Sequence, residues 1–190
     1  MRTAAARIEP APVDRLTPRQ ASLLAPFMAR GSVSNIFRTL LCAPEAFEEL
    51  MGWTLYILSE RNSLPGRERE IIVLRIGYLC RSGYEWTQHA AHGLRMGLTE
   101  EEVSRIKQGP EAPGWSDADT ALLRASDELH QDQFVADPTW AALNRHFSPR
   151  QCMDVVFTAG QYTQISMILN TFGVQLDEGQ TLDPDLLAQS

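Results

Sequence analysis

Apolar residues recur along most of this chain at spacings of three and four, which is the period of one helix face, rather than at the alternating spacing of a strand. The segment from Pro44 to Ser63 shows the pattern clearly. Its apolar positions include Phe47, Leu50, Met51, Trp53, Leu55 and Leu58. The whole chain, interpreted in the same way, predicts helices over about 17–29, 34–42, 44–63, 65–79, 84–96, 100–108, 116–130, 137–146 and 148–172. We therefore predict an all-α fold of eight or nine helices.

Helix-capping residues mark several of these boundaries. Thr17 and Ser148 each precede a proline, which suits an N-cap followed by the first helical residue. Thr99 and Glu102 have the spacing of a capping box, and Gly97 is a typical residue for the end of the helix before it. The boundaries are therefore set largely by local chemistry.

The chain has 190 residues, which fits one domain. We expect a helical domain over residues 17–175. An extended arm at residues 1–16 precedes it, and an irregular acidic tail at residues 176–190 follows it.

The run from Ile71 to Leu79 is apolar on nearly every side, which predicts a helix at the centre of the fold. A buried parallel strand is the alternative, but no Gly-rich turn and no other strand-like run accompanies it. Arg75 lies in the middle of this run, and a buried guanidinium needs a partner. Arg75 either binds a substrate carboxylate or forms a structural salt bridge, and we favour the salt bridge.

The candidate chemistry follows directly, in the segment YEWTQHAAH. On a helix, Glu85 and His89 lie one turn apart on the same face, and His92 continues that stripe. Histidine exchanges protons near neutral pH, so His89 is our first candidate for a general acid or base, with Glu85 orienting it. The neighbouring rings of Tyr84 and Trp86 are candidates for the wall of a pocket.

Each of these residues also has a structural explanation. A Glu–His pair four residues apart is common on solvated helix faces, and aromatic rings most often belong to the core. Glu70 lies in the first turn of its helix, where the helix dipole favours any carboxylate. A metal site at Glu85, His89 and His92 is disfavoured because the histidines lack the four-residue spacing of familiar zinc motifs. A nucleophile at Ser82 would lack the elbow sequence of serine hydrolases.

Five polar side chains interrupt the apolar run of the last predicted helix, and each needs a hydrogen-bond partner. They either line the same pocket or bond across a subunit contact. They are Gln161, Tyr162, Gln164, Ser166 and Asn170.

The composition, 44% hydrophobic and 22% charged, is that of an ordinary globular protein. The net charge of -7 argues against nucleic-acid binding. The N-terminus lacks the apolar core of a signal peptide, and no apolar run reaches the ~18 residues of a membrane helix. Cys42, Cys80 and Cys152 form no CxxC pair, which suits a reducing compartment. We expect a cytoplasmic protein with a small-molecule substrate and no nucleic-acid or membrane partner.

Several stretches of the chain, including these residues, resemble a known family. The stretches RERE-IIVLR, YEWxxH, GL-TEEEVSRI, WSDADTALLRASDELH and VVFTAGQYTQISMILNTFGVQL are similar to longer members of the carboxymuconolactone decarboxylase family, part of the AhpD-like superfamily. The resemblance covers about residues 8–175. It implies an AhpD-like helical bundle that assembles as a homo-oligomer (dimer, trimer or hexamer), with active sites near subunit contacts.

The peroxidase branch of this family uses the pattern Glu…Cys-x-x-Cys-x-x-x-His. The resemblance places that glutamate on Glu70 and that histidine on His89, but the two cysteine positions fall on Ser82 and Glu85. Thiol-dependent peroxide reduction needs both sulfurs, so we reject it. The decarboxylase branch keeps the glutamate and the histidine without the cysteines.

The resemblance therefore implies a carboxy-lyase of aromatic-compound catabolism that needs no cofactor and no metal. It would remove CO2 from 4-carboxymuconolactone or a related carboxylated lactone. His89 would donate the proton, and Glu70 and Glu85 would set its charge. The alternatives are a lactone hydrolase or dehydratase in the same pocket, and a non-catalytic oligomeric binding protein. The substrate-binding candidates are Tyr84, Trp86, Arg75 and His92.

Overall fold

The structure, a computed structural model, describes residues 2–29, 31 and 33–187. Within these residues the chain forms nine α-helices, two short 3-10 helices and no strand. The α-helices are α1 (Pro18–Met28), α2 (Asn35–Leu40), α3 (Pro44–Leu58), α4 (Gly66–Leu79), α5 (Gly83–Arg95), α6 (Glu100–Ile106), α7 (Asp117–Asp132), α8 (Asp137–His146) and α9 (Pro149–Phe172). The 3-10 helices are η1 (Val13–Arg15) and η2 (Pro184–Leu186). The prediction of an all-α fold is confirmed.

Local capping chemistry accounts for the starts of several helices. The hydroxyls of Thr17, Thr99 and Ser148 each accept a hydrogen bond from a backbone N–H in the first turn and complete a capping box. The end of α3 differs from the prediction, because α3 ends at Leu58 rather than at the expected Ser63. The N–H and hydroxyl of Ser63 instead donate to Asp154 on α9, over 2.7 and 2.6 Å. A tertiary contact has therefore ended the helix earlier than its sequence pattern suggests.

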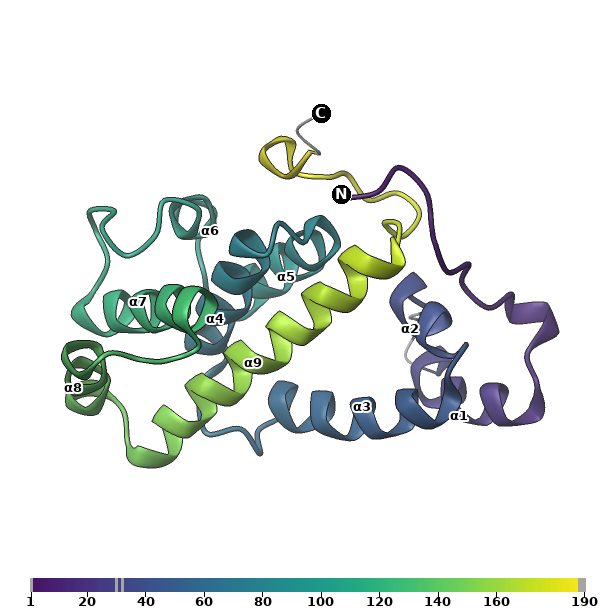
Figure 1. The fold of residues 1–190 in the computed structure, drawn as a ribbon, viewed down its shortest axis with the longest axis horizontal. Helices are drawn as coiled ribbons and strands as arrows, with labels where there is room; N and C mark the ends of the chain where they lie inside the picture. The colour runs from purple at the N-terminus through teal and green to yellow at the C-terminus, as the bar shows by residue number, and fades with distance from the viewer. Residues whose placement is uncertain (1, 30, 32, 188–190) are drawn as a thin grey trace.

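The helices form two groups joined by the longest one. Figure 1 shows α1, α2 and α3 at one end of the molecule and α4 to α8 at the other, with α9 running across both. A large apolar core lies among α4 to α9, and a smaller one lies among α1, α2 and α3. The central position of α4 is confirmed, because the residues from Ile71 to Leu74 and also Ile76 are fully buried.

Both ends of the chain pack against the helices. The backbone N–H groups of Arg7 and Ile8 donate to the carbonyl of Phe172, so the N-terminal arm lies along the end of α9 (Figure 1). After α9 the tail turns back, and the Asp177 carboxylate accepts a hydrogen bond of 2.7 Å from the backbone N–H of Asn35 at the start of α2. Residues 188–190 of the predicted tail lie outside the described residues. The domain boundaries stay predictions.

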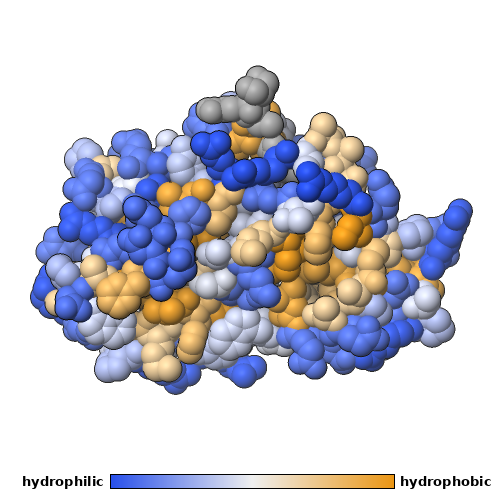
Figure 2. All heavy atoms as spheres, in the orientation of Figure 1, coloured by the Kyte–Doolittle hydropathy of each residue, from blue (hydrophilic) through white to orange (hydrophobic). Residues whose placement is uncertain are grey.

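Several large apolar side chains on α3 and α9 are exposed. Figure 2 shows apolar side chains at several places on one face of the molecule, between polar ones. Trp53 and Leu55 on α3, and Met153, Phe157 and Met167 on α9, are each more than a third exposed. Such exposure is compatible with a subunit contact, but the homo-oligomer stays a prediction. No helix in the described part of the chain has the length and apolar character needed to cross a membrane.

Candidate active site

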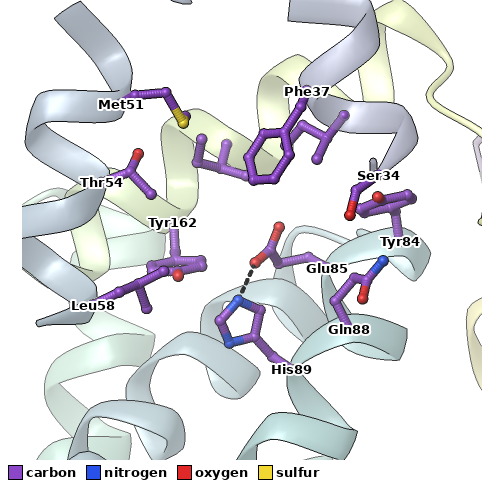
Figure 3. A pocket seen from close by; sticks show the side chains of 12 residues that line it. Ser34, Phe37, Met51, Thr54, Leu58, Tyr84, Glu85, Gln88, His89 and Tyr162 are labelled. Atoms are coloured by element: carbon purple, nitrogen blue, oxygen red, sulfur yellow. Dashed lines mark ion pairs between the residues drawn. The ribbon is translucent and has the colours of Figure 1, made fainter. Parts of the chain in front are cut away.

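His89 lies between two buried carboxylates. Its Nδ1 is 2.7 Å from Oε2 of Glu70 on α4, and its Nε2 is 3.0 Å from Oε1 of Glu85, one turn earlier on α5. The His89 side chain is only 12% exposed, and that of Glu70 is fully buried. The structure thus brings together the three residues that were predicted to act as a catalytic unit, although their role stays a prediction. Figure 3 shows the contact between His89 and Glu85.

Close packing of α5 on α4 makes this arrangement possible. A Cβ atom at Gly93 would lie 2.9 Å from a methyl carbon of Leu98 and 3.3 Å from one of Leu74, both closer than ordinary contact. Glycine at this position therefore lets the two helices approach each other. Because Glu70 belongs to a helix that is apolar on nearly every side, its carboxylate is carried into the interior, where His89 meets it.

The two carboxylates determine the charge of the imidazole. Burial alone would lower the pKa of His89, but the adjacent charges of Glu70 and Glu85 and their hydrogen bonds outweigh burial and raise it to about 10. His89 is therefore an imidazolium at neutral pH, and each ring nitrogen donates to one carboxylate. An imidazolium held in this way is a proton donor that is charged before a substrate arrives.

A cavity of about 200 Å³ lies against this triad, at the junction of the two helix groups. Its wall is mostly apolar, and none of the lining residues is a lysine or an arginine. They come from α2, α3, α5, α9 and the residues just before α2. They are Ser34, Ile36, Phe37, Met51, Thr54, Leu58, Tyr84, Glu85, Gln88, His89, Tyr162 and Ile165 (Figure 3).

Tyr162 of α9 supplies a hydroxyl to this cavity. Its ring meets the His89 ring edge-on, with centroids 4.9 Å apart. Burial, with the nearby charges of Glu85 and Glu70, holds the pKa of Tyr162 well above its usual value, so the hydroxyl stays protonated. Thr54 of α3 adds a second hydroxyl, which accepts a hydrogen bond of 2.9 Å from the Gln161 amide.

The other predicted substrate-binding residues occupy different places. Tyr84 lines the cavity and donates its hydroxyl to Asp177 over 2.9 Å. Trp86 does not line it, because its ring faces Tyr78 and its Nε1 donates to Asp183 of the tail over 3.1 Å. His92 lies behind Glu70, with its Nε2 3.8 Å from Oε1 of that residue.

Arg75 also lies apart from the cavity. Its guanidinium bonds both carboxylate oxygens of Asp127 on α7, over 2.5 and 2.9 Å. It also donates to the backbone carbonyls of Ile106 and Lys107. These contacts match the structural salt bridge that the sequence analysis favoured.

Sequence reasoning missed part of the cavity wall. Tyr162 drew notice because it is polar in an apolar run, but nothing in the sequence marks Thr54 or the other α3 and α2 residues. Gln88 was also missed, although it lies between Glu85 and His89 in the same segment. No group of three His, Cys, Asp or Glu side chains within residues 2–29, 31 and 33–187 is arranged to hold a metal ion.

The fold and one part of the sequence match known proteins. A model of the carboxymuconolactone decarboxylase family matches residues 44–128, which hold α4 and α5 and therefore the whole triad. The solved structure of an AhpD-core, peroxidase-related protein from Ralstonia eutropha JMP134 superposes with a TM-score of 0.78. It is 19% identical, and the match covers 92% of this chain and 95% of that one. The chain therefore has an AhpD-like fold, and over residues 44–128 it is similar to the carboxymuconolactone decarboxylase family.

Other members of the AhpD-like fold resemble this chain as well. A putative antioxidant defence protein AhpD from Agrobacterium tumefaciens gives a TM-score of 0.68 at 21% identity, covering 73% of this chain and 94% of that one. A variant of the debrominase Bmp8, solved with 2,3,4-tribromopyrrole, gives 0.75 at 13% identity, covering 93% and 94%. At such identities these structures show the fold alone. No curated protein matches the sequence.

Glu70 and His89 stand where the resemblance places the glutamate and the histidine, but the sequence has no thiol pair beside them. Ser82 and Glu85 stand at the positions where the resemblance places the two cysteines. Cys80 is nearby, but burial raises the pKa of its thiol, and its Sγ contacts Nδ1 of His130 at 3.6 Å. A protonated thiol is a poor nucleophile.

Proposed function

We propose that this protein is a cofactor-free acid–base enzyme of the lyase or isomerase class, acting on a small lactone-like molecule. One observation carries the proposal: the His89 imidazolium, held by Glu70 and Glu85, lies on the wall of a mostly apolar cavity. Such a site can protonate a carbon or oxygen atom of a molecule that has been removed from water.

The first candidate reaction is decarboxylation, which the family match favours. The bond between the ring carbon and the carboxylate breaks, CO2 leaves, and the electron pair moves toward the lactone carbonyl to form an enolate. The Tyr162 hydroxyl can donate to the enolate oxygen, and His89 can give its proton to the carbon. Glu85, which lies in the cavity wall, can hold the imidazole toward the substrate during this transfer.

The second candidate is isomerisation of an uncharged enol-lactone, which the charge of the lining favours. Among the residues that the structure describes, the cavity wall holds no lysine or arginine, and both nitrogens of His89 already face carboxylates. An anionic substrate would therefore find no available cation there. A lactone without a carboxylate needs only proton transfer: the Glu85 carboxylate can take a proton from one ring carbon, the His89 imidazolium can give a proton to another, and the double bond moves along the ring.

The test compares two substrates with matched histidine variants. CO2 release and the ultraviolet change are measured with 4-carboxymuconolactone, and the ultraviolet change alone with α-angelica lactone. We expect turnover of at least one substrate, its loss in His89→Ala, and its retention in His146→Ala, which removes an exposed histidine outside the site. Turnover that survives in His89→Ala would overturn the proposal, and so would binding of both lactones without turnover by the native protein.

A further inference from the structure

The size of the cavity suits a single ring. At about 200 Å³ it is somewhat larger than an engineered apolar cavity of roughly 150 Å³ that binds benzene. A six-membered ring with one short substituent fits such a space, and any larger part of a ligand would lie outside it, because the cavity is partly open to the surface.

Several hydrogen-bond donors of the cavity wall already have acceptors within the protein. The Tyr84 hydroxyl and the Gln88 amide both donate to Asp177, over 2.9 and 2.6 Å. In contrast, the Tyr162 hydroxyl has no hydrogen-bond partner among the residues that the structure describes, and the Thr54 hydroxyl acts only as an acceptor, from Gln161. Two hydroxyl protons therefore remain for a neutral acceptor atom such as a carbonyl oxygen.

The charges around the cavity oppose an anion. Glu85 lies in the wall and Glu70 lies directly behind His89, so two carboxylates share one imidazolium. Within the described part of the chain, Arg69 is a nearby cation outside the triad, but it is buried, donates to the backbone carbonyl of Ser59 and does not line the cavity. A carboxylate placed in the cavity would lose its water, and the described lining residues would offer it no cation beyond the imidazolium that Glu70 and Glu85 already share.

From this geometry we infer that the substrate is an uncharged, single-ring molecule with a carbonyl-type oxygen, which Tyr162 binds opposite the imidazolium of His89. The inference names the substrate class of the proposed function and rests on it, but it concerns binding and can be tested without turnover. It ranks the neutral enol-lactone above the carboxylated lactone as a substrate.

Three probes of nearly equal shape test the inference by calorimetry at pH 7.5. Benzamide carries a neutral carbonyl, benzoate carries a charge in its place, and toluene offers no acceptor. We expect benzamide to bind at least about tenfold more tightly than benzoate, because like charges oppose each other in a desolvated site. Glu85→Gln should narrow this ratio by improving the affinity for benzoate.

Two tyrosine variants isolate the donor. Tyr162→Phe should weaken benzamide binding about fivefold, the loss of one hydrogen bond, and should leave toluene binding unchanged. Tyr78→Phe is the matched control, because Tyr78 packs on Trp86 and does not line the cavity. It should change neither affinity.

Three outcomes would overturn the inference: benzoate binding as tightly as benzamide, Tyr162→Phe weakening toluene and benzamide equally, or no binding of any probe. These outcomes are separable from failure of the proposed function. Turnover of 4-carboxymuconolactone together with tight benzoate binding would uphold the enzyme and overturn the neutral substrate. Selective benzamide binding without turnover of either lactone would uphold the preference for a neutral ligand and overturn the proposed enzyme activity.

Discussion

The charge of His89 makes the stability of the protein depend on pH, with a sign and size that follow from the triad. The native state binds this proton more tightly than the unfolded chain, because Glu70 and Glu85 raise the pKa from 6.5 to about 10. The stabilisation is complete below pH 6.5, declines as the pH rises, and is lost above pH 10. At 1.36 kcal/mol per pKa unit it amounts to about 5 kcal/mol at its maximum.

The measurable part lies between pH 7 and pH 9. Over this interval the free energy of unfolding should fall by roughly 2 to 3 kcal/mol through His89 alone, since the native state holds nearly one proton more than the unfolded state. Urea unfolding at several pH values measures this fall. In His89→Gln the side chain at position 89 cannot titrate. The part of the decrease in unfolding free energy that comes from His89 should therefore disappear, and only the pH dependence of the other titratable groups should remain.

His146→Gln is the control, because it removes a histidine that is exposed and far from the triad in sequence. It should keep the full pH dependence of the native protein. Equal slopes in the native protein and in His89→Gln would refute the reasoning. A nuclear magnetic resonance titration of His89 with a midpoint near 6.5 would refute it as well, because the imidazole would then not be held between two ionised carboxylates.

Three further outcomes are expected. Tyr162→Phe should lower the kcat of whichever lactone is turned over by about 10²-fold, the loss of one donor to the enolate, with little change in melting temperature. Arg75→Met should lower the free energy of unfolding by about 3 kcal/mol, because it leaves the Asp127 carboxylate without its partner. Enzyme kinetics measured below the melting transition should stay normal. A loss of activity without a loss of stability would contradict this prediction. Peroxide should consume Cys80 slowly in a thiol titration, because burial raises the pKa of that thiol, and rapid loss would reopen the redox role.

The helices were predictable because their signals are local. Capping boxes at Thr17, Thr99 and Ser148 and the glycine after α5 act within one turn, and the structure places helix ends beside each of them. The end of α3 was not predictable in this way. Its last turn competes with the bonds from Ser63 to Asp154, 91 residues later in the chain.

Spacing in the sequence could predict only those contacts of the candidate site that lie within one helix. Glu85 and His89 share a face by spacing alone, and the structure confirms that they meet. The pairing of His89 with Glu70 depends on how α5 packs on α4, which only the family resemblance anticipated. Thr54 and Tyr162 come from α3 and α9, and helical period says which residues share a face but not which other helix that face meets.

The bonds of Asp177 make the C-terminal tail part of the cavity. This one carboxylate accepts hydrogen bonds from the backbone of Asn35, the hydroxyl of Tyr84 and the amide of Gln88, and so ties α2 and α5 together from a residue that lies outside every helix. A chain cut just after α9 would retain every member of the triad and still have a disturbed pocket. Surface segments usually tolerate changes of length, but such a change here would move the supports of the candidate site.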